Sequence, residues 1–148
     1  MFYQAIKPVS ERPSGLCLFV DLEWKLVYVS APENTEHDQE LDDCLVGPIP
    51  IGINSFEFEA QAPDQSKIDP KDVLGVTAVI LTGSYNDNEF VRVGYYQNTE
   101  YDSPELRETP PATILWDRLV RDLNDKPRVT RFHIKWYVWC VLCRAIIH

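Results

Sequence analysis

Strict alternation of apolar and polar side chains along short segments is the feature that most constrains the fold. In residues 54–61, Phe56, Phe58 and Ala60 alternate with Glu57 and Glu59, which is the period of a strand with one face in water. Further strands are expected at 23–30, 44–46, 75–85, 89–97 and 128–136. Short strands that do not alternate with helices predict an antiparallel all-β domain, and a sandwich more than a barrel or a parallel sheet.

The helical signal in this sequence is confined to residues 114–124. Leu115, Leu119 and Leu123 recur there at a spacing of four residues, just after Pro110 and Pro111. This spacing places the three side chains on one face of a helix. One short helix is therefore predicted over residues 114–124.

The segment 76–81 is apolar on both of its faces. Thr77, Val79 and Leu81 alternate with Val76, Ala78 and Ile80. Either the strand is covered on both sides, or one face is an exposed apolar stripe that binds a partner. Asn86, Asp87 and Asn88 predict a hairpin to residues 89–97, which carry Arg92 and Tyr96. These two residue types are enriched at interface centres. The acidic segment 33–43 is the expected partner of Arg92.

The charge of the 148-residue chain is uneven. Residues 1–111 carry 20 acidic and 7 basic residues, a net charge of −13, whereas residues 112–148 carry 3 acidic and 7 basic residues, a net charge of +4. A mostly acidic surface disfavours direct nucleic acid binding and favours encounter with basic proteins. Acidity that merely keeps a small protein soluble is the simpler alternative.

Residues suited to catalysis or to metal binding are few. The sequence has no Gly-rich phosphate loop, no G-x-S-x-G elbow and no H-E-x-x-H motif. His133 is interpreted as a structural histidine, and the aspartates at 64, 69 and 72 as parts of solvated turns. No catalytic residue, metal or cofactor is expected.

Four cysteines lie at positions 17, 44, 140 and 143. No apolar export segment precedes them, so free thiols are predicted. The pair Cys140 and Cys143 is interpreted as packing, with a redox dithiol as the alternative. The closing run 136–148 contains Arg144 and is too short to span a membrane.

Seven segments in order resemble the anti-silencing histone chaperones: DLEWKLVYVS (21–30), LVGPIPIG (45–52), FEFEAQAPD (56–64), GVTAVILT (75–82), EFVRVGYYQNTEY (89–101), ELRETPP (105–111) and PRVTRFHIKW (127–136). The resemblance implies an immunoglobulin-like β-sandwich with one or two short helices and without catalytic activity. It also implies a monomeric nuclear protein that binds the dimer of core histones three and four, blocks its tetramerisation and hands it over for nucleosome assembly and disassembly.

The resemblance also implies three groups of binding residues. The surface for histone three comprises Asp38, Asp72, Val76, Ala78, Ile80, Arg92 and Tyr96. The tail of histone four adds a strand beside Tyr95, Arg128, Val129 and Thr130. Basic peptides of downstream histone-deposition complexes bind a second face that contains Asp21, Glu23, Asp42, Val46 and Phe56.

The resemblance covers residues 21–136. We therefore divide the chain into a histone-chaperone domain at 21–136, an atypical N-terminal segment at 1–20 and an atypical apolar C-terminal tail at 137–148. The family's usual first strand is atypical or missing here, and Leu16 to Phe19 are the candidate substitute. A different class of function, an immunoglobulin-like interaction domain with lost or altered histone binding, remains the alternative.

Overall fold

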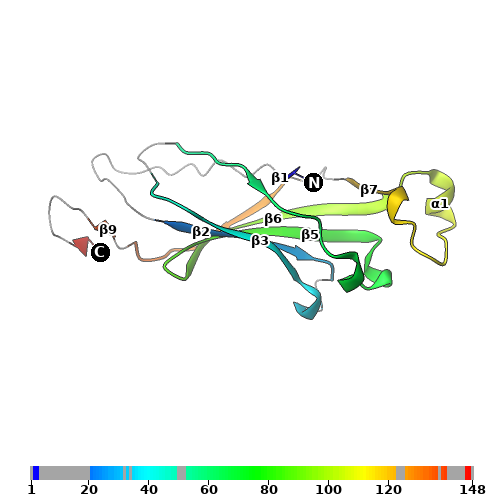
Figure 1. Cartoon of the computed structure of the whole chain (residues 1–148), viewed down its shortest axis with the longest axis horizontal. Helices are drawn as coiled ribbons and strands as arrows, with labels where there is room; N and C mark the ends of the chain where they lie inside the picture. The colour runs from blue at the N-terminus through cyan, green and yellow to red at the C-terminus, as the bar shows by residue number, and fades with distance from the viewer. Residues whose placement is uncertain are drawn as a thin grey trace.

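The main element of the structure is a curled, six-stranded antiparallel sheet (Figure 1). The computed structural model describes residues 2–3, 21–31, 33, 35–49, 53–122, 126–136, 138–139 and 146–147. The sheet order is β3-β2-β5-β6-β7, and β8 also pairs with β6. Its strands are β2 (Leu22–Val29), β3 (Gln39–Val46), β5 (Gly75–Tyr85), β6 (Asn88–Tyr101), β7 (Leu119–Asp122) and β8 (Arg128–Arg131).

Two short strand pairs stand apart from this sheet. Strand β1 (Phe2–Tyr3) pairs with β4 (Phe58–Glu59), and β9 (Val138–Trp139) pairs with β10 (Ile146–Ile147). The predicted all-β sandwich class is confirmed. The first strand of the structure is only two residues long, and Leu16 to Phe19 lie outside the described residues.

The core lies on one face of the main sheet, which we call the inner face. Leu22, Trp24, Leu26 and Tyr28 alternate with half-buried residues along β2. Segment 53–64 covers this face, because the rings of Phe56 and Trp24 lie 5.3 Å apart between centroids. The predicted alternation of this segment is confirmed in burial, although only β4 within it is a strand.

The turn between β5 and β6 has the geometry that the sequence predicts for a tight hairpin. Asn86 and Asp87 have φ angles of 48° and 62°. Asparagine and aspartate tolerate this left-handed region better than other non-glycine residues. The register that follows places Ala78 opposite Tyr96 and Ile80 opposite Gly94.

The predicted helix over residues 114–124 is wrong. The structure has a 3-10 turn, η4 (Trp116–Arg118), followed by β7, while residues 123–125 lie outside the described residues. Leu119 pairs with Tyr101 of β6, so pairing with an existing strand outweighs the four-residue leucine spacing.

The only α-helix among the described residues is α1 (Pro104–Glu108), at the end of the sheet opposite the β5–β6 turn (Figure 1). The sequence carries the start signals of this helix, Ser103 at the N-cap and Pro104 in the first turn.

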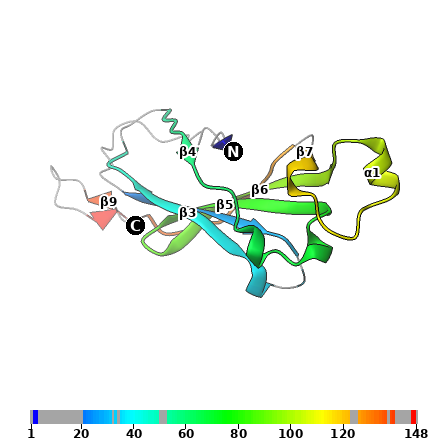
Figure 2. The same ribbon diagram turned by 45° about the vertical axis from the view of Figure 1, so that its right-hand side comes forward.

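Three 3-10 turns lie side by side at one edge of the sheet (Figure 2). They are η1 (Thr35–His37), η2 (Gln65–Lys67) and η3 (Pro70–Asp72). Asp64 and Asp69 accept backbone hydrogen bonds as the N-caps of η2 and η3, which confirms the predicted turns. No described helix is long and apolar enough to cross a membrane.

Candidate functional site: the outer face of the sheet

The outer face of β5 carries the apolar stripe, which we define as Val76, Ala78 and Ile80. Their neighbours Thr77, Val79 and Leu81 are buried in the core. Val76 has 66% of its surface exposed, and Ala78 and Ile80 are partly exposed. Of the two sequence interpretations, the structure therefore supports the exposed stripe over a strand covered on both sides.

Strand β2 widens the stripe with two residues that the sequence prediction did not include. Val29 lies opposite Ala78 and Val27 lies opposite Ile80. Both valines are half-buried, on the face of β2 away from the core. Their alternation with Leu26 and Tyr28 was the signal that could have identified them.

Tyr96 lies beside the stripe, opposite Ala78. Its ring leans over Gly94, where a Cβ atom would be 3.3 Å from the ring. The guanidinium carbon of Arg128 lies 4.8 Å from the centroid of the same ring, a cation–π contact. A side chain at residue 94 would require the Tyr96 ring to shift by a few tenths of an ångström.

Arg92 marks one end of the outer face, opposite Thr82. Its Nε and Nη2 atoms donate to the two carboxylate oxygens of Glu89, at 2.7 and 2.9 Å. The predicted pairing of Arg92 with the acidic segment 33–43 is therefore wrong, because a carboxylate three residues away is already in reach. The Arg92 guanidinium also lies over the Phe132 ring, 5.9 Å from its centroid.

The acidic residues Asp38 and Asp72 belong to the opposite end of the stripe. Asp72 ends η3, four residues before Val76, and Asp38 lies between η1 and β3. Gln39 pairs with Tyr28 and also exchanges two hydrogen bonds with the backbone of Asp64, at 2.8 and 3.1 Å. These contacts hold β3 against the η2 turn.

A shallow groove of about 540 Å³ runs between these turns. It is lined by Glu36, His37, Asp38, Gln39, Ser66, Lys67, Ile68, Asp69 and Pro70. Oδ1 of Asp38 is buried and has no hydrogen-bond partner among the described residues. Burial raises the pKa of this carboxyl group above its ordinary value, since the charged form is poorly solvated. The groove is therefore suited to a basic group that pairs with Asp38.

The residues predicted to contact histone four lie along β8 and its partner β6. Arg128 and Thr130 face the outer side, opposite Gly94 and Arg92. Val129 lies opposite the buried Val93 and therefore faces the inner side, as Tyr95 does. Burial raises the pKa of the Tyr95 phenol. The four residues are neighbours, but they lie on both the inner and the outer face of the sheet.

The residues predicted to contact deposition complexes gather around the β2–β3 edge. Glu23 lies on the outer side, 3.2 Å from Lys25 Nζ, and Asp42 is exposed on β3. Val46 lies opposite Leu22 on the inner side, where Phe56 packs on Trp24. Asp21 is exposed at the start of β2. This group therefore also surrounds a sheet edge and does not form one flat face.

Residues with catalytic or metal-binding potential are not brought together. Within the described ranges no group of three or more His, Cys, Asp and Glu residues could hold a metal ion. His133 is exposed and lies beyond β8, so its interpretation as a structural histidine on a strand is wrong. Cys44 is a free thiol, whereas Cys17, Cys140 and Cys143 lie outside the described residues.

An exposed apolar stripe on an all-β sandwich is typical of a protein-interaction domain, and comparison with known proteins makes this class specific. A family model described as ASF1 like histone chaperone matches residues 14–137. The chain therefore belongs to the ASF1-like histone chaperone family.

Several curated proteins have closely similar sequences. Histone chaperone ASF1 of Mycosarcoma maydis is 60% identical over 117 residues, which cover 78% of this chain and 67% of that protein. The Candida albicans protein of the same name is 53% identical over 135 residues, 90% of this chain and 51% of that protein. The Coccidioides immitis protein of that name is 58% identical over 117 residues, which cover 78% of this chain and 43% of that protein. The matched part of the chain thus spans between 43% and 67% of the length of these relatives.

Proposed function

We propose that this protein is a histone chaperone that binds the dimer of core histones three and four. In this role it blocks tetramerisation of the dimer and hands it over for nucleosome assembly and disassembly. The observation that carries the proposal is the exposed apolar stripe on the outer face, in a chain of the ASF1-like histone chaperone family. The curated relatives are named histone chaperones, in agreement with this role.

The stripe supplies the apolar contact for histone three. Covering Val76, Ala78, Ile80 and Tyr96 would remove apolar surface from water, worth about 25 cal/mol per Å². Asp38 and Asp72 at one end offer carboxylates to basic side chains, and Arg92 at the other end offers a guanidinium group. Charges of opposite sign at the two ends would fix the direction in which a histone helix lies. A dimer held by this face cannot use the same surface to join a second dimer.

The tail of histone four would extend the sheet at β8, beside Tyr95, Arg128, Val129 and Thr130. The four residues of β8 are exposed and pair with β6 on one side. Backbone pairing at this edge needs no particular side chain on the tail.

The β2–β3 edge would receive basic peptides of downstream histone-deposition complexes. It carries the exposed Asp21 just before β2, the exposed Asp42 within β3 and the partly exposed Glu23 on β2. The protein would work as a monomer in the nucleus, by binding alone and without catalysis.

Substituting Ala78 by Arg tests the histone-three surface. The added side chain would cover the stripe between Val76 and Ile80 and place a positive charge where a basic partner must approach. We expect this variant to keep the wild-type circular dichroism spectrum and melting temperature, and to lose histone binding. Thr113→Arg is the matched control, because it adds the same charge on an exposed loop remote from the stripe in sequence.

The readout is size-exclusion chromatography with light scattering, on the chain mixed with the tetramer of histones three and four at moderate salt. Wild type and T113R should give a complex of one chain with one dimer, and A78R should leave the tetramer intact. A wild-type chain that is folded but leaves the tetramer intact would support the alternative, an interaction domain with lost or altered histone binding. Equal binding by A78R would overturn the assigned surface.

A further inference from the structure

Strand β8 presents an open edge. It pairs with β6 over Val91–Gly94, and no other described strand pairs with β8. All four of its residues are exposed. An edge strand of this kind offers a row of unpaired N–H and C=O groups to any extended segment that approaches it.

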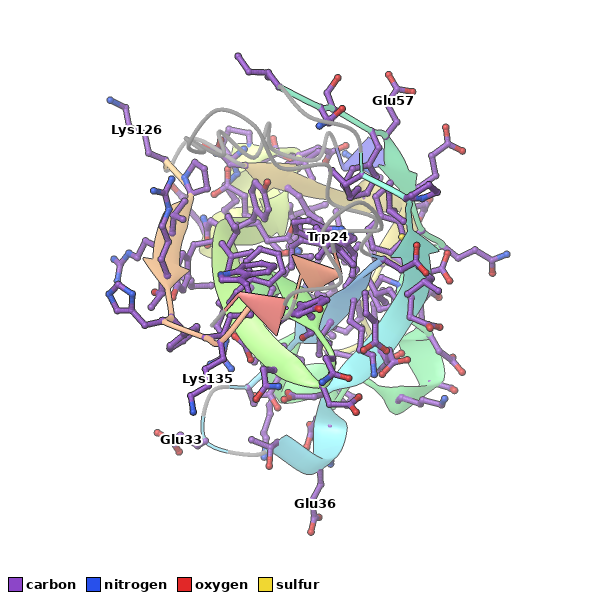
Figure 3. All side chains as sticks on the ribbon, turned by 90° about the vertical axis from the view of Figure 1, so that its left-hand side faces the viewer. Trp24, Glu33, Glu36, Glu57, Lys126 and Lys135 are labelled. Atoms are coloured by element: carbon purple, nitrogen blue, oxygen red, sulfur yellow. The ribbon has the colours of Figure 1, made fainter. Side chains whose placement is uncertain are left out.

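The side chains around this edge are basic, in contrast to most of the chain. Residues 126–136 contain Lys126, Arg128, Arg131 and Lys135 and no acidic residue. Figure 3 shows Lys126 and Lys135 on the side of the molecule that carries β8, with Glu57 on the opposite side. None of the four basic residues forms an ion pair with another described residue.

Charge on an edge strand ordinarily prevents edge-to-edge aggregation. The same charge also gives the edge a preference for acidic segments, because the basic side chains attract carboxylates. The other edge of the sheet, β3, carries Glu40, Asp42 and Asp43 and has the opposite preference. The two edges of one sheet are thus complementary to different partners.

We infer that the open edge of β8 binds an acidic segment in extended conformation. The register defines the pattern of this segment: Arg128 lies on the outer face, whereas Val129 and Arg131 lie on the inner side. Directly opposed side chains on paired strands are about 5 Å apart. The segment would therefore place acidic residues opposite Arg128 and Arg131, with an apolar residue opposite Val129, which is 49% exposed.

An extended peptide fits this edge better than nucleic acid does. Phosphates would be drawn to the four basic residues, but they would meet a chain with a net charge of −9. They would also leave the backbone row of β8 without a complementary strand. The acidic segment would occupy the edge that we propose for the tail of histone four, so the two would exclude each other. The inference goes beyond the proposed function and does not require it.

The test is fluorescence anisotropy on the purified full chain, without histones. The probe is a short labelled peptide of repeated Glu-Val-Thr-Glu units. We expect saturable binding that Arg128→Glu with Arg131→Glu weakens more than about tenfold, because two attractive pairs, each worth a factor of up to about five, become repulsive. Lys67→Glu with Lys71→Glu is the matched control, since it makes the same charge change on η2 and η3. This control should bind the peptide within about twofold of wild type.

Two further comparisons separate strand pairing from simple attraction. A peptide with proline in place of valine has the same charge but lacks one backbone donor in each unit, and proline disrupts strand pairing, so this peptide should bind at least tenfold more weakly. Equal binding of this peptide, equal loss in the K67E/K71E control, or a duplex DNA that binds more tightly than the peptide would each overturn the inference.

Arg131→Gln keeps the length of the side chain and serves if the double variant does not fold. It should weaken peptide binding severalfold. Absence of peptide binding in wild type would refute the inference and leave the histone experiment above unaffected, because that experiment tests the stripe on β5.

Discussion

Arg92 pairs with the nearby Glu89 and not with the distant acidic segment 33–43 that the sequence suggested. Glu89 lies three residues away on the same strand, and its carboxylate accepts both hydrogen bonds of the guanidinium fork. Half of the Arg92 side chain remains exposed. An exposed pair of this kind contributes about 1 kcal/mol or less, so a binding partner with its own carboxylate can compete with Glu89.

Gly83 is a residue where a close approach excludes any side chain. A Cβ atom there would lie 2.8 Å from Val91 Cγ1 and 2.9 Å from Trp24 Cζ3. Gly83→Ala should lower the free energy of unfolding by about 1–3 kcal/mol, because the buried indole ring would have to move. Urea denaturation measures this value, with the neighbouring Ser84→Ala as the control. An unchanged midpoint for G83A would show that the Trp24 ring is not fixed by this contact.

Asp38 should make histone binding sensitive to pH. Burial raises the pKa of its carboxyl group, so it takes up a proton at a higher pH than an ordinary aspartate. Because a basic partner needs the charged form, affinity should fall as the pH decreases through this raised pKa, and the partner's binding should release a proton.

Asp38→Asn removes the titrating group. Near neutral pH we expect this variant to bind about tenfold more weakly, and to lose the part of the pH dependence that Asp38 contributes. Isothermal titration calorimetry at several pH values measures both effects. Asp117→Asn, on the exposed turn η4, is the control; an unchanged pH profile in D38N would mean that Asp38 does not meet the partner's charge.

At the scale of elements, segment 102–122 shows why local spacing predicted the wrong structure. Arg118 Nε lies 2.8 Å from an Asp102 oxygen, and Arg107 Nε donates to the Tyr101 carbonyl at 2.6 Å. These contacts, with the pairing of Leu119 and Tyr101, hold the segment against the end of β6. A helix over residues 114–124 would keep its leucine stripe but lose the strand pairing.

The β5–β6 hairpin should gain stability from a residue better suited to its turn. Asp87 has a φ of 62°, a region that costs non-glycine residues about 1 kcal/mol. Asp87→Gly should raise the free energy of unfolding by about 0.5–1 kcal/mol. Thermal or urea unfolding measures the change, and Asp87→Val, which favours extended backbone, should act in the opposite direction. A loss of stability in D87G would contradict the assigned turn.

At the scale of the whole molecule, charge is separated between the edges of one sheet. Acidic residues gather at β3 and basic ones at β8, although the chain as a whole carries a net charge of −9. Such a molecule has a field that orients basic partners before contact.

The association rate with histones should therefore depend on salt more strongly than the dissociation rate. Raising ionic strength from low to physiological values should slow association by about tenfold or more, while dissociation changes little. Stopped-flow fluorescence measures both rates. Asp42→Asn with Asp43→Asn, which reduces the acidic charge, should flatten the salt dependence; a rate independent of salt would show that the acidity serves solubility alone.

The sequence by itself determined the strands whose side chains alternate, because a period of two directly reflects which face is buried. It thereby determined the β2 core residues, the β5–β6 hairpin and the apolar stripe around Ala78. The ordered segments also indicated the family that the family model later confirmed. The strands, the hairpin and the stripe are specified by residues close together in the sequence. The family is indicated by several sequence segments that occur in the same order.

Only the tertiary structure decided the features that depend on distant partners. Residues 119–122 form β7 and not a helix, because they pair with the end of β6. Val27 and Val29 extend the stripe, because β2 lies beside β5. Arg92 pairs with Glu89. The tertiary structure also left one edge of the sheet acidic and the other basic. The physical reason is that strand pairing joins segments far apart in the chain, and no local pattern specifies which edge a segment will meet.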